Sequence, residues 1–319
     1  MTVSRVSKSK YLLVTAIVML VTMLSATDPT EELSEAEMGR ILFFDKRFSL
    51  NNSISCADCH IPQFAFSDTT ALSKGFAGKS TTRNAPPLTN LGGRPYFFWD
   101  GRAATLEEQA LQPIQHPAEM GMNIEELNKR LQANPQYVNW FKKQYQQLPN
   151  AQLAAKAIAA FERTLETGNA PFDLFMDGDS GAISISAMRG RDIFMEKGKC
   201  FDCHFSPDFT ADEFKNIGLF NGKNLNDSGR YSVTGNPTDI GKFRVPGLRN
   251  VAITAPYMHN GMFKSLEAVI EFYNNPSQKF PDAINRDSTL NKPLNLSTRE
   301  KSDLLAFLQT LTSTSAKTK

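Results

Sequence analysis

The sequence predicts an all-α fold built from two helical units with long irregular loops, and two observations lead to this prediction. A Cys-x-x-Cys-His string occurs twice, at residues 56–60 and 200–204, and a Gly-Arg-x-x-Phe string precedes each copy, at 39–43 and 190–194. Helical periodicity and helix caps recur along the chain, whereas no convincing run of alternating apolar and polar residues marks a strand. A duplicated helical unit would produce such a weak internal repeat.

Each Cys-x-x-Cys-His string is the attachment signature of a c-type haem. Two thiols one helical turn apart can bond the two vinyl groups of a porphyrin, and the following histidine then faces the iron as an axial ligand. The residues are Cys56, Cys59 and His60 in the first string, and Cys200, Cys203 and His204 in the second. These strings contain all four cysteines of the chain, so none remains for a disulfide. The alternatives are a Cys-x-x-Cys redox pair and a Cys₂His zinc site, and the histidine that ends both copies favours two covalently bound haems.

Length and charge set broad limits on the protein. With 319 residues the chain is long enough for two domains of ordinary size. The formal net charge is +2, and acidic and basic residues are interspersed along the chain, so no nucleic-acid partner is expected.

The N-terminal segment 1–27 resembles a targeting signal. Arg5, Lys8 and Lys10 precede an apolar run over 11–24, which is short for a transmembrane span and suits a signal peptide. The segment before Thr27 is not a clean cleavage site, so cleavage and retention as an N-terminal anchor both stay open. In either case we expect the folded part in the periplasm, where haem c is attached.

The helices are predicted from their first turns and from apolar periodicity. Four of them begin near residues 35, 106, 124 and 135. A fifth runs from 151 to about 167, before Gly168, and the last covers 298–311. The stretch 168–184 is rich in Gly, Asp and Ser and is the predicted domain boundary. It separates an N-terminal cytochrome c-like domain, 28–168, from a C-terminal one, 169–319.

Five longer motifs accompany the two haem strings. They are Arg83-Asn84-Ala85-Pro86, the stretch 97–103 with 106–110, Glu119-Met120, Arg249-Asn250-Val251, and the stretch 255–261 (Ala-Pro-Tyr-Met-His-Asn-Gly). Together they resemble the bacterial dihaem cytochrome c peroxidase family, which also contains the MauG-type enzymes, over about residues 33–311. The resemblance implies that the first haem is the peroxidatic one and that the second transfers electrons.

The resemblance also implies roles for residues around the first haem. Trp99 matches the family's tryptophan between the haems, and Glu119 matches its distal acid, which moves a proton between the two oxygens of peroxide. Gln109 and Pro113 match residues that line the same distal pocket. Without the flanking motifs, Trp99 would be an ordinary core aromatic and Glu119 a solvated surface charge.

Two departures from the family pattern bear on the axial ligands. Many members carry a histidine in the loop that matches residues 73–78, where this chain has Phe76 and no histidine. We therefore expect a five-coordinate or weakly water-bound first haem that needs no reductive activation. The family's methionine ligand of the second haem matches Tyr273, as in MauG-type enzymes, and a phenolate would lower the potential of that haem. Met258 and Met262 are the alternative ligands.

Three further sites follow from the remaining histidines and from the resemblance. We expect His259 to be a hydrogen-bonding residue near the second haem. His116 is either a polar loop residue near the distal channel or a reversible ligand. The family's calcium ion implies a side-chain oxygen from Asn84 and backbone carbonyls from Thr254 and Pro256.

The leading hypothesis is a peroxidase that reduces hydrogen peroxide to water with electrons from a small soluble cytochrome c or cupredoxin. The second hypothesis is a MauG-like oxidase that uses peroxide to modify residues of a partner protein. A third, from a different class, is a non-enzymatic electron carrier with two permanently ligated haems. A homodimer is compatible with each of them.

Overall fold

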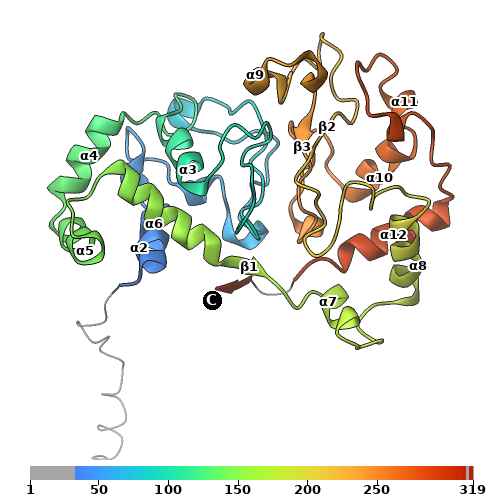
Figure 1. The fold of residues 1–319 in the computed structure, drawn as a ribbon, viewed down its shortest axis with the longest axis horizontal. Helices are drawn as coiled ribbons and strands as arrows, with labels where there is room; N and C mark the ends of the chain where they lie inside the picture. The colour runs from blue at the N-terminus through green and yellow to red at the C-terminus, as the bar shows by residue number, and fades with distance from the viewer. Residues whose placement is uncertain (1–32, 314–315, 319) are drawn as a thin grey trace, which may run out of the picture. The chain divides into compact units, whose positions relative to one another are not determined.

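Helices and irregular loops dominate the computed structural model, which describes residues 33–313 and 316–318 (Figure 1). This confirms the predicted all-α class. The predicted targeting segment 1–27 lies outside the described residues, and the domain boundary over 168–184 stays a prediction. Within the described part, no helix is long and apolar enough to cross a membrane.

The first group of helices surrounds α6 (Ala151–Thr164), which packs against α2 (Glu35–Phe43) and α3 (Leu106–Gln115). Helix α6 places a continuous apolar face inward, and Gly39 lets α2 approach it closely, because a Cβ there would overlap the carbonyl oxygen of Ala157. The other two helices of this group are α4 (Ile124–Ala133) and α5 (Pro135–Tyr145). Their N-caps, Asn123 and Asn134, accept hydrogen bonds from the first turns, as predicted for such starts.

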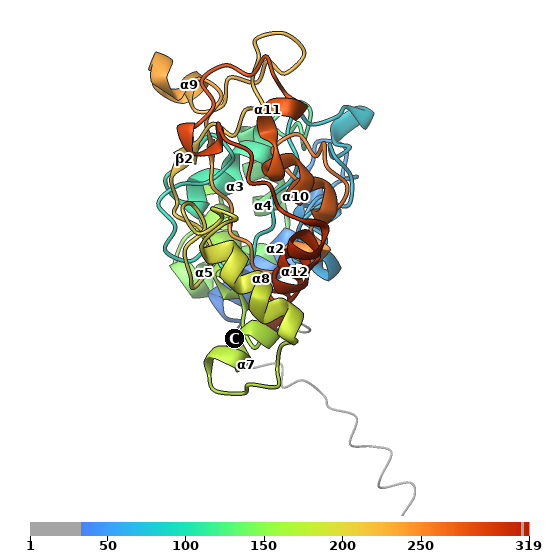
Figure 2. The same ribbon diagram turned by 90° about the vertical axis from the view of Figure 1, so that its right-hand side faces the viewer.

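In the second group, α8 (Ile185–Met195) crosses α12 (Thr298–Gln309), and Figure 2 shows the two helices side by side. Gly190 allows this crossing in the same way as Gly39, since a Cβ there would overlap the carbonyl oxygen of Asp303. The predicted capping box of Ser297 and Glu300 opens α12. The remaining helices are α7 (Pro171–Met176), α9 (Tyr231–Thr234), α10 (Leu266–Asn274) and α11 (Pro276–Lys279).

Four short strands form two antiparallel pairs in the described residues. β1 (Leu165–Thr167) pairs with β4 (Ala316–Thr318), and β2 (Phe214–Lys215) pairs with β3 (Phe243–Arg244). The helix predicted over 151–167 therefore ends at Thr164, because its last three residues pair as a strand. Single turns of 3₁₀ helix occur at Lys46–Phe48, Cys56–Asp58, Pro62–Phe64, Phe76–Gly78, Pro237–Asp239, Val251–Ile253 and Ser288–Leu290.

A constant shift of 160 residues relates the middles of the two groups. It brings Trp99 onto His259 and the N-cap Thr105 of α3 onto the N-cap Ser265 of α10. The turns before these helices close with equivalent bridges, Phe97 to Ala103 and Tyr257 to Phe263. Two equivalent backbone hydrogen bonds join these two copies of the repeated segment. The N–H of Asn84 donates to the oxygen of His259, and that of Arg244 donates to the oxygen of Trp99, each at 2.7 Å.

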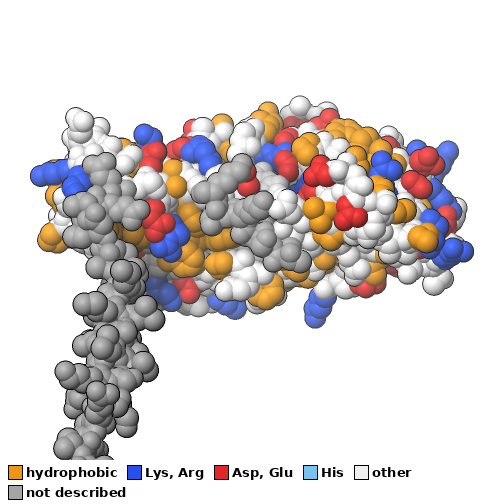
Figure 3. Space-filling view, turned by 90° about the horizontal axis from the view of Figure 1, so that it is seen from below, with side chains coloured by type: hydrophobic (Ala, Val, Ile, Leu, Met, Phe, Trp, Pro, Cys, Tyr) orange, Lys and Arg blue, Asp and Glu red, His pale blue; other side chains and the backbone are white. Residues whose placement is uncertain are grey.

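The surface of the protein carries no large region of one charge on the face shown in Figure 3, where acidic and basic side chains are interspersed. This distribution agrees with the near-neutral net charge of the sequence. It gives no reason to expect a nucleic-acid partner.

Candidate haem cavities

The two Cys-x-x-Cys-His strings have the same local geometry. The backbone N–H groups of His60 and His204 each donate to the first cysteine's carbonyl, at 2.9 Å in both cases. Each imidazole Nδ1 lies at hydrogen-bond distance from a carbonyl oxygen, 2.9 Å from that of Phe66 and 2.8 Å from that of Phe209. Both phenylalanines have a left-handed backbone, with φ of 56°, which turns their carbonyls toward the rings.

This geometry suits both histidines for coordinating iron. A carbonyl oxygen can only accept, so Nδ1 carries the proton and Nε2 keeps its lone pair. Burial also lowers the pKa of both imidazoles and favours the neutral form that binds metals. The carbonyl partner fixes the ring orientation, as is typical of metal-ligating histidines. The strings therefore fit two haem c groups.

A cavity of about 620 Å³ lies beside the first string and brings the predicted residues together. His60, Trp99, Gln109, Pro113 and Glu119 all line it. A smaller adjoining cavity reaches Cys56 and is also lined by His60, Gln109, Pro113 and Glu119. The structure thus brings these five side chains to one cavity, and their predicted roles stay predictions.

Glu119 lies at the wall of the first cavity with its side chain 28% exposed. Burial raises the pKa of its carboxyl, and the nearby His116 and Arg102 partly oppose that shift. Oε1 of Glu119 is 3.5 Å from Nδ1 of His116, whose ring is 43% exposed to solvent. The carboxyl therefore holds a proton more readily than a fully exposed glutamate does.

The loop that lacks the family's histidine is packed against Glu119. The N–H of Phe76 donates to the carbonyl of Glu119 at 2.6 Å, and Gly75 lies so close to Glu119 that a Cβ would collide with its backbone. Phe76 contacts Gly121 and is not among the residues that line the first cavity.

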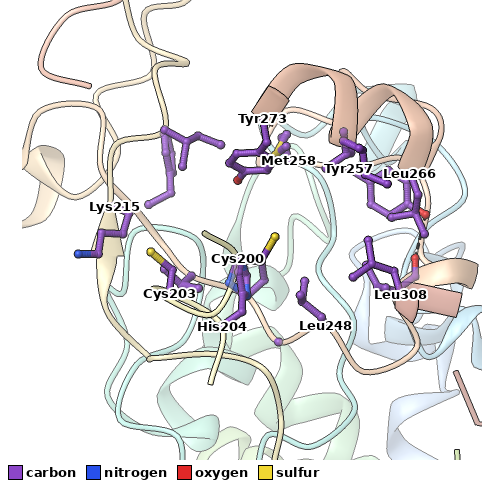
Figure 4. Close-up of a pocket in the computed structure, with 18 of the residues that line it drawn as sticks. Cys200, Cys203, His204, Lys215, Leu248, Tyr257, Met258, Leu266, Tyr273 and Leu308 are labelled. Carbon is purple, nitrogen blue, oxygen red and sulfur yellow. Dashed lines mark hydrogen bonds between the residues drawn. The ribbon is translucent and has the colours of Figure 1, made fainter. Parts of the chain in front are cut away.

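A second cavity, of about 200 Å³, lies beside Cys200, Cys203 and His204. Most of its lining is apolar, and Figure 4 shows Tyr273 and Met258 on the side opposite His204. Burial raises the pKa of the Tyr273 hydroxyl. Met262 is not a lining residue; it belongs to an apolar cluster beside α10. Of the three candidate ligands, Tyr273 and Met258 therefore face this cavity.

Trp99 and His259 lie where the two copies meet. Trp99 lines both cavities, and its indole N–H donates to the carbonyl of Asn84 at 2.9 Å. Its ring centroid is 6.5 Å from that of His259. His259 lines the second cavity and stacks on Phe243 at 3.7 Å, and burial lowers its pKa to about 4. The predicted surroundings of His259 agree with this placement, although its ring interacts through stacking.

The three residues expected to bind calcium, Asn84, Thr254 and Pro256, all line the second cavity. The Asn84 side-chain N–H group donates to the carbonyls of Thr70 and Ala71, which leaves Oδ1 as the atom available to a ligand. Among the described residues, no cluster of three or more His, Cys, Asp or Glu side chains forms a metal site, so any ion here would be held by neutral oxygens and water.

Two polar residues at the cavities were missed by the sequence reasoning. Glu162, on α6, is 3% exposed and lines the cavity around Cys56, where burial raises its pKa to about 8. Arg244 is 9% exposed and lines both cavities. A signal for Arg244 was present in the sequence, because the 160-residue shift aligns it with Asn84. No feature of the neighbouring sequence marks Glu162.

Comparison with known proteins agrees with this geometry. The family model of the di-haem cytochrome c peroxidases matches residues 34–181. The methylamine utilization protein MauG of Methylorubrum extorquens is 40% identical over 86% of this chain and 77% of its own length. Cytochrome c551 peroxidase of Nitrosomonas europaea is 35% identical over 88% of this chain and 81% of its own. Among solved structures, a MauG-like protein associated with microbial copper homeostasis is 34% identical, with a TM-score of 0.80 over 90% of this chain and 91% of its own.

Proposed function

Because the chain belongs to the dihaem cytochrome c peroxidase family, we propose that peroxide is reduced at the first cavity with electrons delivered through the second. The reaction is H₂O₂ + 2 e⁻ + 2 H⁺ → 2 H₂O, and the donor is a small soluble cytochrome c or cupredoxin. One observation carries the proposal. The 160-residue shift that brings α3 onto α10 places Pro113 at the position of Tyr273. Proline offers no metal-ligating side chain, so this position would not give the iron of the first haem the ligand that Tyr273 would give the second.

A haem held by Cys56, Cys59 and His60 would supply the redox chemistry of peroxide cleavage. Glu119 accepts the proton of the inner peroxide oxygen and returns it to the departing oxygen, and its raised pKa suits both steps. His116 links this carboxyl to solvent and replaces the protons that leave as water. Trp99, which lines both cavities, carries electrons between them.

A MauG-like oxidation of a partner protein is the second candidate, and the tyrosine at the second cavity favours it. Burial opposes ionisation of Tyr273, so its phenolate would form only beside a cation such as ferric iron. Such a ligand stabilises oxidised iron and favours storing oxidising equivalents over passing electrons inward. A mass increase of a co-expressed partner protein after peroxide addition would establish this function, and an unchanged mass would exclude it for that partner.

Electron paramagnetic resonance of the oxidised holoprotein tests the proposal against a plain electron carrier. We expect one high-spin ferric signal from the first haem and one low-spin signal from the second. Peroxide should then be consumed when a reduced small cytochrome c is supplied. Two low-spin signals without peroxide turnover would contradict the proposal and support a carrier.

The remaining features extend the same proposal. Calcium bound by Asn84, Thr254 and Pro256 would join segments from both copies beside Trp99. Removing it with a chelator should change the spectra of the haems, and re-addition should restore them. Export to the periplasm and a homodimer are further expectations, which fractionation and light scattering of the holoprotein test.

A further inference from the structure

Four of the described residues line both haem cavities: Asn84, Pro87, Trp99 and Arg244. Only Arg244 carries a charge. Its N–H donates to the carbonyl of Trp99 at 2.7 Å, which fixes the position of its backbone between the two sites. A cation placed there acts on both haems at once.

The Arg244 guanidinium has few partners within the protein. Nε lies 3.4 Å from the carbonyl of Phe98, and Nη1 lies 3.7 Å from Oδ1 of Asp212. The other oxygen of Asp212 is bound by Arg94 at 2.8 Å. A guanidinium offers five N–H donors, so most of these donors remain for a group in the cavities.

This arrangement is costly unless an anion completes it. The side chain of Arg244 is 10% exposed, and burying a charge without a close partner is unfavourable. Burial lowers its pKa to about 10, so the guanidinium is still charged at neutral pH. The cavities on either side of Arg244 should therefore receive negatively charged groups.

The haem itself provides such groups. The thioether bonds of haem c lie on one edge of the porphyrin, and its two propionates lie on the opposite edge. Cys56 lies in the small adjoining cavity with Glu162 and Ile158, and Arg244 is not part of that lining. Arg244 shares the first cavity with Cys59 and the second with Cys200 and Cys203, so a porphyrin attached at either string would lie in a cavity that this guanidinium borders.

We propose that Arg244 binds a propionate of each haem and is a positioning residue shared by the two sites. This inference depends on the proposed function in one respect: both haems must be bound. Fork-shaped donors suit two carboxylates, and the guanidinium charge favours the reduced form of both irons. The equivalent residue, Asn84, is neutral, so the second copy alone supplies this charge.

Reduction potentials of the holoprotein, measured by spectroelectrochemistry, test the proposal. Arg244→Gln should shift the midpoint potentials of both haems to lower values, and Arg244→Lys should shift both by less. The matched control is Arg249→Gln, which removes an arginine of similar burial that pairs with Asp173 and lines neither cavity. It should leave both potentials unchanged.

A shift confined to one haem, or none in Arg244→Gln, would overturn the proposal. If Arg244→Gln fails to fold or to take up haem, Arg244→Lys decides. Its resonance Raman propionate bending bands should differ from those of the parent protein for both haems, and unchanged bands would overturn the proposal. Potentials and bands can be measured without turnover, so these results stay separate from a failure of the peroxidase proposal.

Discussion

The two haem cavities are built on the same frame and differ at a few equivalent positions. In each, the histidine Nδ1 donates to the carbonyl of a phenylalanine whose backbone is left-handed. In each, a helix with a side-chain N-cap lines the same cavity. The first cavity measures about 620 Å³ and the second about 200 Å³. On the opposing helix, Gln109 and Pro113 of the first site stand where the second has Val269 and Tyr273. The difference teaches that one helical frame can present different side chains to its cavity at equivalent positions.

Replacing Pro113 with the tyrosine found at the equivalent position of the second site should have the largest effect. In Pro113→Tyr, a phenol occupies the first cavity as Tyr273 occupies the second. We expect loss of the high-spin ferric signal and of peroxide turnover, measured by electron paramagnetic resonance and by peroxide consumption. Pro113→Ala is the matched control, because it also restores a helix N–H but adds no ligand, and it should keep both properties.

Removing the distal proton carrier tests the polar character of the first cavity. Glu119→Gln keeps the shape of the side chain but cannot shuttle a proton, and turnover should fall by about 10²–10⁴-fold. The spectrum of the second haem should not change. Glu125→Gln, at an exposed position of α4, is the control. Turnover in Glu119→Gln equal to that of the control would remove Glu119 from the mechanism.

Removing a candidate ligand from the second cavity is the converse of adding one to the first. Tyr273→Phe removes the hydroxyl oxygen that faces His204, so we expect the second haem to change from low spin to high spin. Met258→Leu serves as its counterpart, since it removes the alternative ligand. If the Met258 variant changes the spin state and the Tyr273 variant does not, the ligand assignment is wrong.

The smallest effect concerns Glu162, a carboxyl at a position where the second site has a leucine. The pairing of Asn90 with Leu165 and of Asn250 with Leu311 matches α6 to α12, and it places Glu162 where the second cavity has Leu308. In the folded state the pKa of Glu162 is about 8, against 4.5 when unfolded. Between these pH values only the folded state keeps the proton, so the free energy of unfolding falls as pH rises from 4.5 to about 8 and then levels off.

Replacing Glu162 should remove that fall, which amounts to about 5 kcal/mol on this shift. Denaturant unfolding of the holoprotein between pH 5 and pH 9 would measure it. Both Glu162→Gln and Glu162→Leu should flatten the pH profile, and Glu162→Leu should also be more stable at high pH. A profile as steep as that of the parent protein would show that another group is responsible.

Local sequence signals predicted much of the helical framework. The starts of α4 and α5 follow from Asn123 and Pro135, and α12 follows from its capping box. The strand pairs escaped prediction because segments of two or three residues are too short to show alternation. The sequence reasoning also included Met262 as a ligand candidate, since residue type does not reveal which side of a turn faces a cavity.

The sequence by itself determined the chemistry that can be attached: two thiol pairs, each followed by its histidine. This signal is short-range, because the participating residues lie within five positions of one another, whereas Gln109, Pro113 and Glu119 were predicted only through the resemblance to a family. Only the tertiary structure decided that Arg244 meets both cavities and that Glu162 is buried beside Cys56. Both depend on packing between segments far apart in the chain, and burial, which sets the cost of a charge, exists only after those segments have come together.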